Sequence, residues 1–141
     1  MEAGHPGRDA ERDALELFAQ GRGAMRLWAG WLLAGGGWAL HLLASYGLVD
    51  WYCRGRSALG AFDLLLILHA VTLLSLGLAL AGLTLSARNL RLLSLAQCDA
   101  DGNVSYSRSR FIAMGGVIFS LYMTVIILLE EWANFVLVPC V

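Results

Sequence analysis

Three long stretches of apolar residues dominate the chain, and polar segments separate them. The stretches cover residues 27–49, 64–85 and 111–129, and none of them contains an Asp, Glu, Lys or Arg. An α-helix crosses a hydrocarbon core of about 30 Å with about 20 predominantly apolar residues. We therefore predict membrane-spanning helices over about 27–49, 62–86 and 111–137.

The end of the third helix has two interpretations. Glu130 and Glu131 follow its apolar run, and the chain then resumes as the apolar segment WANFVLVPCV. In the first interpretation, the helix continues through both glutamates. In the second, it ends at Leu129, because 19 residues already span about 28 Å, and the glutamates lie at the membrane interface.

Composition places the chain among integral membrane proteins. Of its 141 residues, 58% are hydrophobic and only 15% are charged, and its mean hydropathy is +0.64. A soluble domain of this size has too much surface to carry so little charge. We predict an all-α membrane protein with a segment over residues 1–24 and a three-helix transmembrane domain over 25–141. The net charge of −1 gives no basis for nucleic acid as a partner, so the expected environment is the lipid bilayer.

The arginines predict the orientation. Two lie between the first and second helices, and eight lie before the first helix or between the second and third: Arg8, Arg12, Arg22, Arg26, Arg88, Arg91, Arg108 and Arg110. Basic residues favour the cytoplasmic side, which predicts N-in and C-out. The absence of Lys is typical of GC-rich bacterial genomes, so we expect a multi-pass protein of the bacterial cytoplasmic (inner) membrane.

The N-terminal segment is polar and lacks the features of a cleavable signal peptide, so the first helix is expected to remain as an anchor. Residues 8–21 have the pattern of a short amphipathic helix, with Leu15, Phe18 and Ala19 on one face and Gly21 at its end. The alternative for this cytoplasmic segment is a disordered tail.

Two of the three cysteines fall on the outer side of the predicted topology. Cys53 follows the first helix and Cys140 follows the third, whereas Cys98 lies in the cytoplasmic loop. The oxidising periplasm allows a Cys53–Cys140 disulfide to form and persist. The alternative is a pair of free thiols. The sequence contains no CxxC motif, which argues against a thiol–disulfide oxidoreductase.

Three ionisable residues fall at similar depth in the outer leaflet. His41 lies about 13 Å below the outer end of the first helix, and His69 and Glu131 each lie about 10 Å below the ends of theirs. His41 shares a helical stripe with small residues, which favour close helix contacts, so it is predicted to face the bundle interior. Glu131 shares a polar stripe with Asn134, and Glu130 is predicted to point well away from that stripe.

These residues support three hypotheses. Intramembrane ionisable residues usually face the interior and are paired, so the first is a hydrogen-bonded cluster that holds the helices in register. The second is a metal site of His41, His69 and Glu131, or a haem or copper cofactor bound by His41 and His69, as in a membrane electron-transfer protein. The third is a proton- or quinone-linked role. The sequence contains no catalytic motif, so we do not expect an enzyme.

Several of these residues also form a pattern across the three spans: Trp38, His41, Ser45, Tyr46 and Cys53 in the first, His69 and Thr72 in the second, and Pro139 and Cys140 in the third. This pattern resembles a family of small three-helix bacterial membrane proteins that are found among cytochrome c oxidase genes. The resemblance covers residues 27–141, and the paired glutamates are not part of it. It implies a non-catalytic accessory subunit or assembly protein of a respiratory oxidase, in contact with other membrane subunits of the respiratory chain. A self-assembling small membrane protein is a further alternative.

Overall fold

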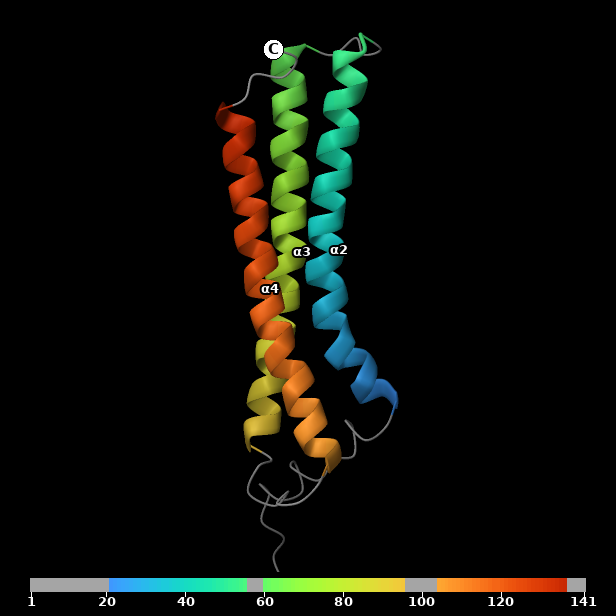
Figure 1. Cartoon of the computed structure of the whole chain (residues 1–141), viewed down its shortest axis with the longest axis vertical. Coiled ribbons are helices and arrows are strands. Elements are labelled where there is room, and N and C mark those ends of the chain that lie inside the picture. Colours follow the sequence, from blue (N-terminus) through green and yellow to red (C-terminus); the bar gives the residue numbers. More distant parts are fainter. Residues whose placement is uncertain (1–20, 56–59, 96–103, 137–141) are drawn as a thin grey trace, which may run out of the picture.

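Three long helices form the whole of the described structure. The computed structural model describes residues 21–55, 60–95 and 104–136. It contains α2 (Gly21–Cys53), α3 (Ala61–Leu95) and α4 (Val104–Val136), which lie side by side and alternate in direction (Figure 1). All three are long and apolar enough to cross a membrane, which confirms the prediction of an all-helical membrane protein with three spans.

Each helix is longer than the apolar run that predicted it. Helices of 33, 35 and 33 residues extend about 50 Å, whereas the hydrocarbon core is about 30 Å thick. The extra turns carry polar residues at the helix ends, such as Arg88 and Arg91 on α3. α4 continues through both glutamates to Val136, so the alternative in which this helix ends at Leu129 is wrong.

One seam of buried residues on α3 packs against the neighbouring helices. Its buried residues follow one another at intervals of three or four, which keeps them on one face of a helix. Six of these nine are small or polar, and only the end positions are Leu: Leu64, Leu68, Thr72, Ser75, Ala79, Gly82, Ser86, Asn89 and Leu93. Small side chains let neighbouring backbones approach closely, which is how helices associate in lipid.

The closest backbone contacts are between α2 and α3. A Cβ added at Gly82 would lie 2.6 Å from the carbonyl oxygen of Gly30, and one added at Gly37 would lie 2.8 Å from that of Ser75. The predicted small-residue stripe of α2 therefore does face the interior. Near the other end of this interface, the amide of Asn89 donates to the carbonyl oxygen of Arg26 at 3.1 Å.

Trp31 of α2 packs against α4. The ring of Trp31 stacks on Phe119 with a centroid distance of 4.7 Å and covers Gly115, where an added Cβ would lie 2.8 Å from the indole. The Trp31 indole N–H also donates to the carbonyl oxygen of Ile112 at 3.2 Å. A large side chain of one helix thus occupies the space left by consecutive glycines of the other.

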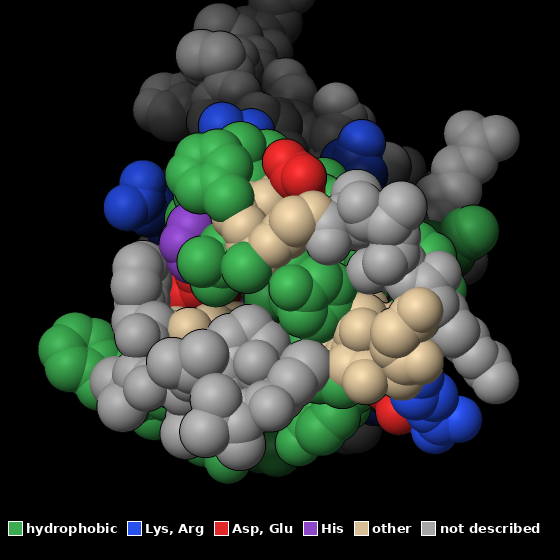
Figure 2. Space-filling view, turned by 90° about the horizontal axis from the view of Figure 1, so that it is seen from above, with side chains coloured by type: hydrophobic (Ala, Val, Ile, Leu, Met, Phe, Trp, Pro, Cys, Tyr) green, Lys and Arg blue, Asp and Glu red, His purple; other side chains and the backbone are tan. Residues whose placement is uncertain are grey.

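The outer surface of the bundle is largely apolar. Viewed end-on, hydrophobic side chains surround the helices, and one histidine reaches the surface beside an acidic side chain (Figure 2). Large exposed residues such as Leu43, Leu73 and Ile118 face outward. This surface is suited to contact with lipid chains. The predicted amphipathic segment lies outside the described residues, and the orientation of the bundle in the membrane stays a prediction.

Candidate functional site

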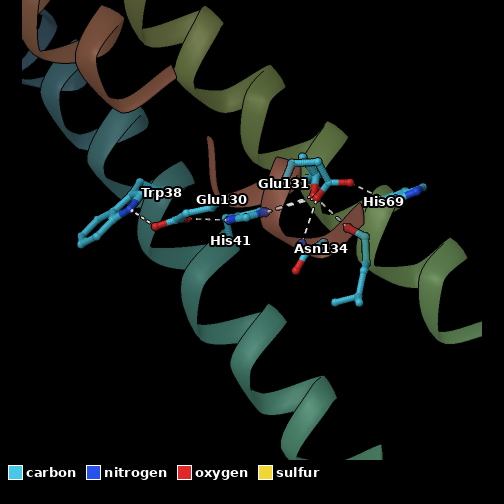
Figure 3. Close-up of polar contacts among 8 residues, drawn as sticks. Trp38, His41, His69, Glu130, Glu131 and Asn134 are labelled. Atoms are coloured by element: carbon cyan, nitrogen blue, oxygen red, sulfur yellow. Dashed lines mark hydrogen bonds and ion pairs between the residues drawn. The ribbon is translucent and has the colours of Figure 1, made fainter. Parts of the chain in front are cut away.

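His41 is the centre of a polar cluster that connects the three helices. Its side chain is 1% exposed, and both of its ring nitrogens have partners. Nδ1 lies 3.0 Å from Oε2 of Glu130 on α4, and Nε2 lies 3.0 Å from the hydroxyl oxygen of Thr72 on α3 (Figure 3). A single imidazole of α2 therefore contacts both neighbouring helices.

Glu130 is held between two side chains of α2. Its second carboxylate oxygen, Oε1, accepts a hydrogen bond of 3.3 Å from the indole N–H of Trp38. Trp38 precedes His41 by three residues, so the two side chains lie on the same face of the helix. Glu130 is 33% exposed, and it marks one edge of the cluster.

Thr72 lies between His41 and Glu131 and contacts both. Its hydroxyl lies 2.6 Å from Oε2 of Glu131 and 3.0 Å from the carbonyl oxygen of Leu68, so its one proton has two acceptors. The shorter distance favours donation to Glu131. When the hydroxyl donates there, its oxygen is free to accept from Nε2 of His41.

Glu131 is the second centre of the cluster. Its Oε1 lies 2.6 Å from Nδ1 of His69, and its Oε2 accepts 3.0 Å from the side-chain amide of Asn134. Nε2 of His41 is 3.9 Å from the same Oε2. The Glu131 side chain is 13% exposed, whereas that of His69 is 40% exposed and lies at the opposite edge of the cluster from Glu130 (Figure 3).

The structure thus brings together His41, His69 and Glu131, the three residues selected from the sequence by depth. Glu130, which was predicted to point away from the stripe of Glu131, does face a different helix, and there it contacts His41. α4 packs against two helices at once, and its consecutive glutamates divide between them. Glu130 faces α2 and Glu131 faces α3. Two neighbouring residues differ by about 100° around a helix, so consecutive side chains can reach different neighbouring helices.

The cluster contains two carboxyl groups and two imidazoles, and this ratio limits its charge. A net charge is expensive inside a membrane, so the whole group is favoured when it is neutral. With both carboxyl groups deprotonated and both imidazoles neutral, the cluster would carry two negative charges. Two added protons would make it neutral. The close carboxyl–imidazole pairs in the cluster are His41 with Glu130 and His69 with Glu131. The protons can occupy either partner of each pair without changing the net charge.

The metal and haem hypotheses fit this arrangement poorly. A metal ligand must offer a lone pair, whereas both ring nitrogens of His41 lie at hydrogen-bond distance from other side chains. Among the described residues, no group of three or more His, Cys, Asp or Glu side chains could hold a metal ion. A metal or a haem bound by His41 and His69 would have to break the contacts that join the helices.

The predicted disulfide would join the C-terminal end of α2 to the segment that follows α4. Cys53 is the last residue of α2, and Cys140 lies outside the described residues. The Cys53–Cys140 bridge therefore stays a prediction.

Known proteins provide no further guide to this site. No protein-family model, no curated protein and no solved structure matches the chain.

Proposed function

We propose that this protein is a non-catalytic accessory subunit or assembly protein of a bacterial respiratory oxidase, located in the inner membrane with its N-terminus inside and its C-terminus outside. The polar cluster is the observation that carries the non-catalytic part of the proposal. Its side chains are joined to one another across α2, α3 and α4, which is the arrangement of a clamp that fixes three helices.

The remaining surface supports a role in association with other membrane proteins. In the apolar stretch of each helix, only 17–28% is buried inside the bundle. Most of this apolar surface is therefore available to lipid and to other subunits. The resemblance of the Trp38, His41, His69 and Thr72 pattern to proteins encoded among cytochrome c oxidase genes supports an oxidase as the partner complex.

We propose that the disulfide is a covalent cross-link that stabilises the same bundle. A Cys53–Cys140 bridge on the periplasmic side would tie the outer ends of α2 and α4, close to the cluster. Peptide mapping of unreduced membranes tests it directly, and Cys53 recovered in a freely alkylated form excludes the bridge. Reporter enzymes fused after Val141, one active only in the periplasm and one only in the cytoplasm, test the orientation.

The partner is tested by affinity purification of the full chain from native membranes in a mild detergent. We expect oxidase subunits in the mass spectrum and haem absorbance in the eluate. Clamp disruption by His41→Ala is expected to reduce this recovery, whereas Gly36→Ala, where an added Cβ meets no other atom within 4 Å, should leave it unchanged. Recovery of the chain alone, or only as a homo-oligomer, would refute the oxidase proposal and favour the self-assembling alternative.

A further inference from the structure

A continuous line of polar contacts crosses the bundle from one exposed edge to the other. It runs from Glu130 through His41 and Thr72 to Glu131 and ends at His69 (Figure 3). Successive polar atoms along it are separated by 3.0, 3.0, 2.6 and 2.6 Å. The three interior members are mostly buried, with exposed fractions of 1% for His41, 5% for Thr72 and 13% for Glu131.

The two ends of this line differ from its middle in their access to the surroundings. The side chains of Glu130 and His69 are 33% and 40% exposed, and they lie on different sides of the cluster. A clamp alone does not require partly exposed ionisable groups at both ends, because exposure of such groups within a membrane is unfavourable. Exposure at both ends is what the exchange of a proton with an outside group requires.

We propose that this line is a proton relay that runs across the bundle within the outer half of the membrane. It accepts a proton at Glu130 and delivers one at His69, or the reverse. The ligand of each end is a proton donor or acceptor that meets the side of the bundle, such as an ionisable group of a partner subunit or a water molecule. The inference does not depend on the identity of the complex proposed above.

Each step moves one proton and breaks one bond to hydrogen for each bond formed. The Glu130 carboxylic acid donates to Nδ1 of His41, and Nε2 of His41 releases its proton to the Thr72 hydroxyl oxygen. Thr72 transfers its own proton to Oε2 of Glu131. Glu131 then delivers a proton to Nδ1 of His69 from Oε1, the oxygen that faces it. His69 then releases a proton from Nε2 to the outside acceptor, and Glu130 takes up one from the outside donor, so the neutral charge of the cluster is restored.

Among the described residues, few other charged groups lie near the relay. The described residues that face His41 from neighbouring helices include Glu130 and Glu131 of α4, and His69 of α3 lies behind Glu131. On α2 itself, Asp50 lies about 13 Å farther along the helix and is exposed in an ion pair with Arg54. Asp63, at the start of α3, caps the backbone N–H of Gly60 at the helix end.

The relay is tested by the rate at which the His41 ring proton exchanges with water. The full chain, labelled with ¹⁵N-histidine in lipid nanodiscs, provides this rate by NMR. Glu130→Gln blocks the route from His41 through Glu130. Thr72→Val blocks the route through Thr72 and preserves the shape of the side chain. We expect each single variant to exchange through the remaining route. The double variant should exchange about a hundredfold more slowly, the lower end of what a positioned proton-transfer group contributes.

Two further variants separate the relay from a static clamp. In the Glu130→Gln background, Thr72→Ser retains the hydroxyl and should keep the exchange fast. Glu131→Gln in the same background retains volume and should slow exchange as Thr72→Val does, which supplies a second test if the valine variant fails to fold. The relay is overturned if the exchange rate of a double variant is slowed only by the product of the two factors found for its single variants. It is also overturned if, in the Glu130→Gln background, Thr72→Ser exchanges as slowly as Thr72→Val.

Discussion

The contact between α2 and α3 can be tested by adding a single methyl group. In Gly82→Ala, the new Cβ would lie 2.6 Å from the carbonyl oxygen of Gly30, 3.1 Å from the backbone nitrogen of Ala34 and 3.3 Å from its Cβ. Two of these atoms belong to backbone, so no rotamer change can relieve the contact. The two helices must move apart by several tenths of an ångström.

The matched control lies on the same helix. A Cβ added at Gly77 meets no other atom within 4 Å. Both substitutions gain the same helix propensity, up to about 1 kcal/mol for Gly to Ala. The difference between them therefore isolates the overpacking, which costs about 1–3 kcal/mol in a well-packed interface. We expect Gly77→Ala to be neutral or stabilising and Gly82→Ala to lose this amount relative to it.

The free energy of unfolding is measured by titrating the purified protein from mild-detergent micelles into sodium dodecyl sulfate and following tryptophan fluorescence. The midpoint for Gly82→Ala should fall at a lower dodecyl sulfate fraction than that for Gly77→Ala. Equal midpoints would show that the two helices are not in backbone contact at this level, and the seam described for α3 would be incorrect.

The same titration tests three other contacts. His41→Ala should destabilise the bundle by about 1–3 kcal/mol, because it leaves the partners of a buried imidazole unpaired, whereas Leu43→Ala on the exposed face should have little effect. Trp31→Phe keeps the stacking on α4 but loses the indole donor at 3.2 Å, so a loss of about 1 kcal/mol is expected; a stability equal to that of the unmodified protein would contradict the hydrogen bond. Asn89→Asp should destabilise more than Asn89→Leu, because a carboxylate would face the carbonyl oxygen of Arg26, and the opposite order would argue against this contact.

Hydrophobic length predicted the fold well, because the bilayer imposes a minimum run of apolar residues on each span. It predicted the helix ends poorly. Outside the hydrocarbon core a helix continues for as long as its own residues and its neighbours favour it, and hydropathy contains no information on that point. Residues 86–95 of α3, which include two arginines, illustrate this, although their RNLRLLSL pattern already indicates continued helix.

The site was predicted in part for a different reason. Depth along each helix indicated that His41, His69 and Glu131 lie at one level, and the small residues around His41 indicated its inward direction. The role of Glu130 could not be predicted from a stripe of polar residues, because such a stripe identifies the face of α4 toward one neighbouring helix. α4 packs against two helices. Trp38 was singled out only as part of the family pattern, which says nothing about its partner. Its donation to Glu130 depends on the axial register of α2 and α4.

That register is determined far from the cluster. The indole of Trp31 lies over Gly115 and Gly116 of α4, and Glu130 follows Gly116 by 14 residues, or about 21 Å. A helix is stiff along its axis. A side chain added at these glycines would therefore shift α4 as a rigid body, and the shift would also displace Glu130 and Glu131. The pairing of Glu130 with His41 therefore depends on the absence of side chains at two positions, Gly115 and Gly116, that lie several turns away along α4.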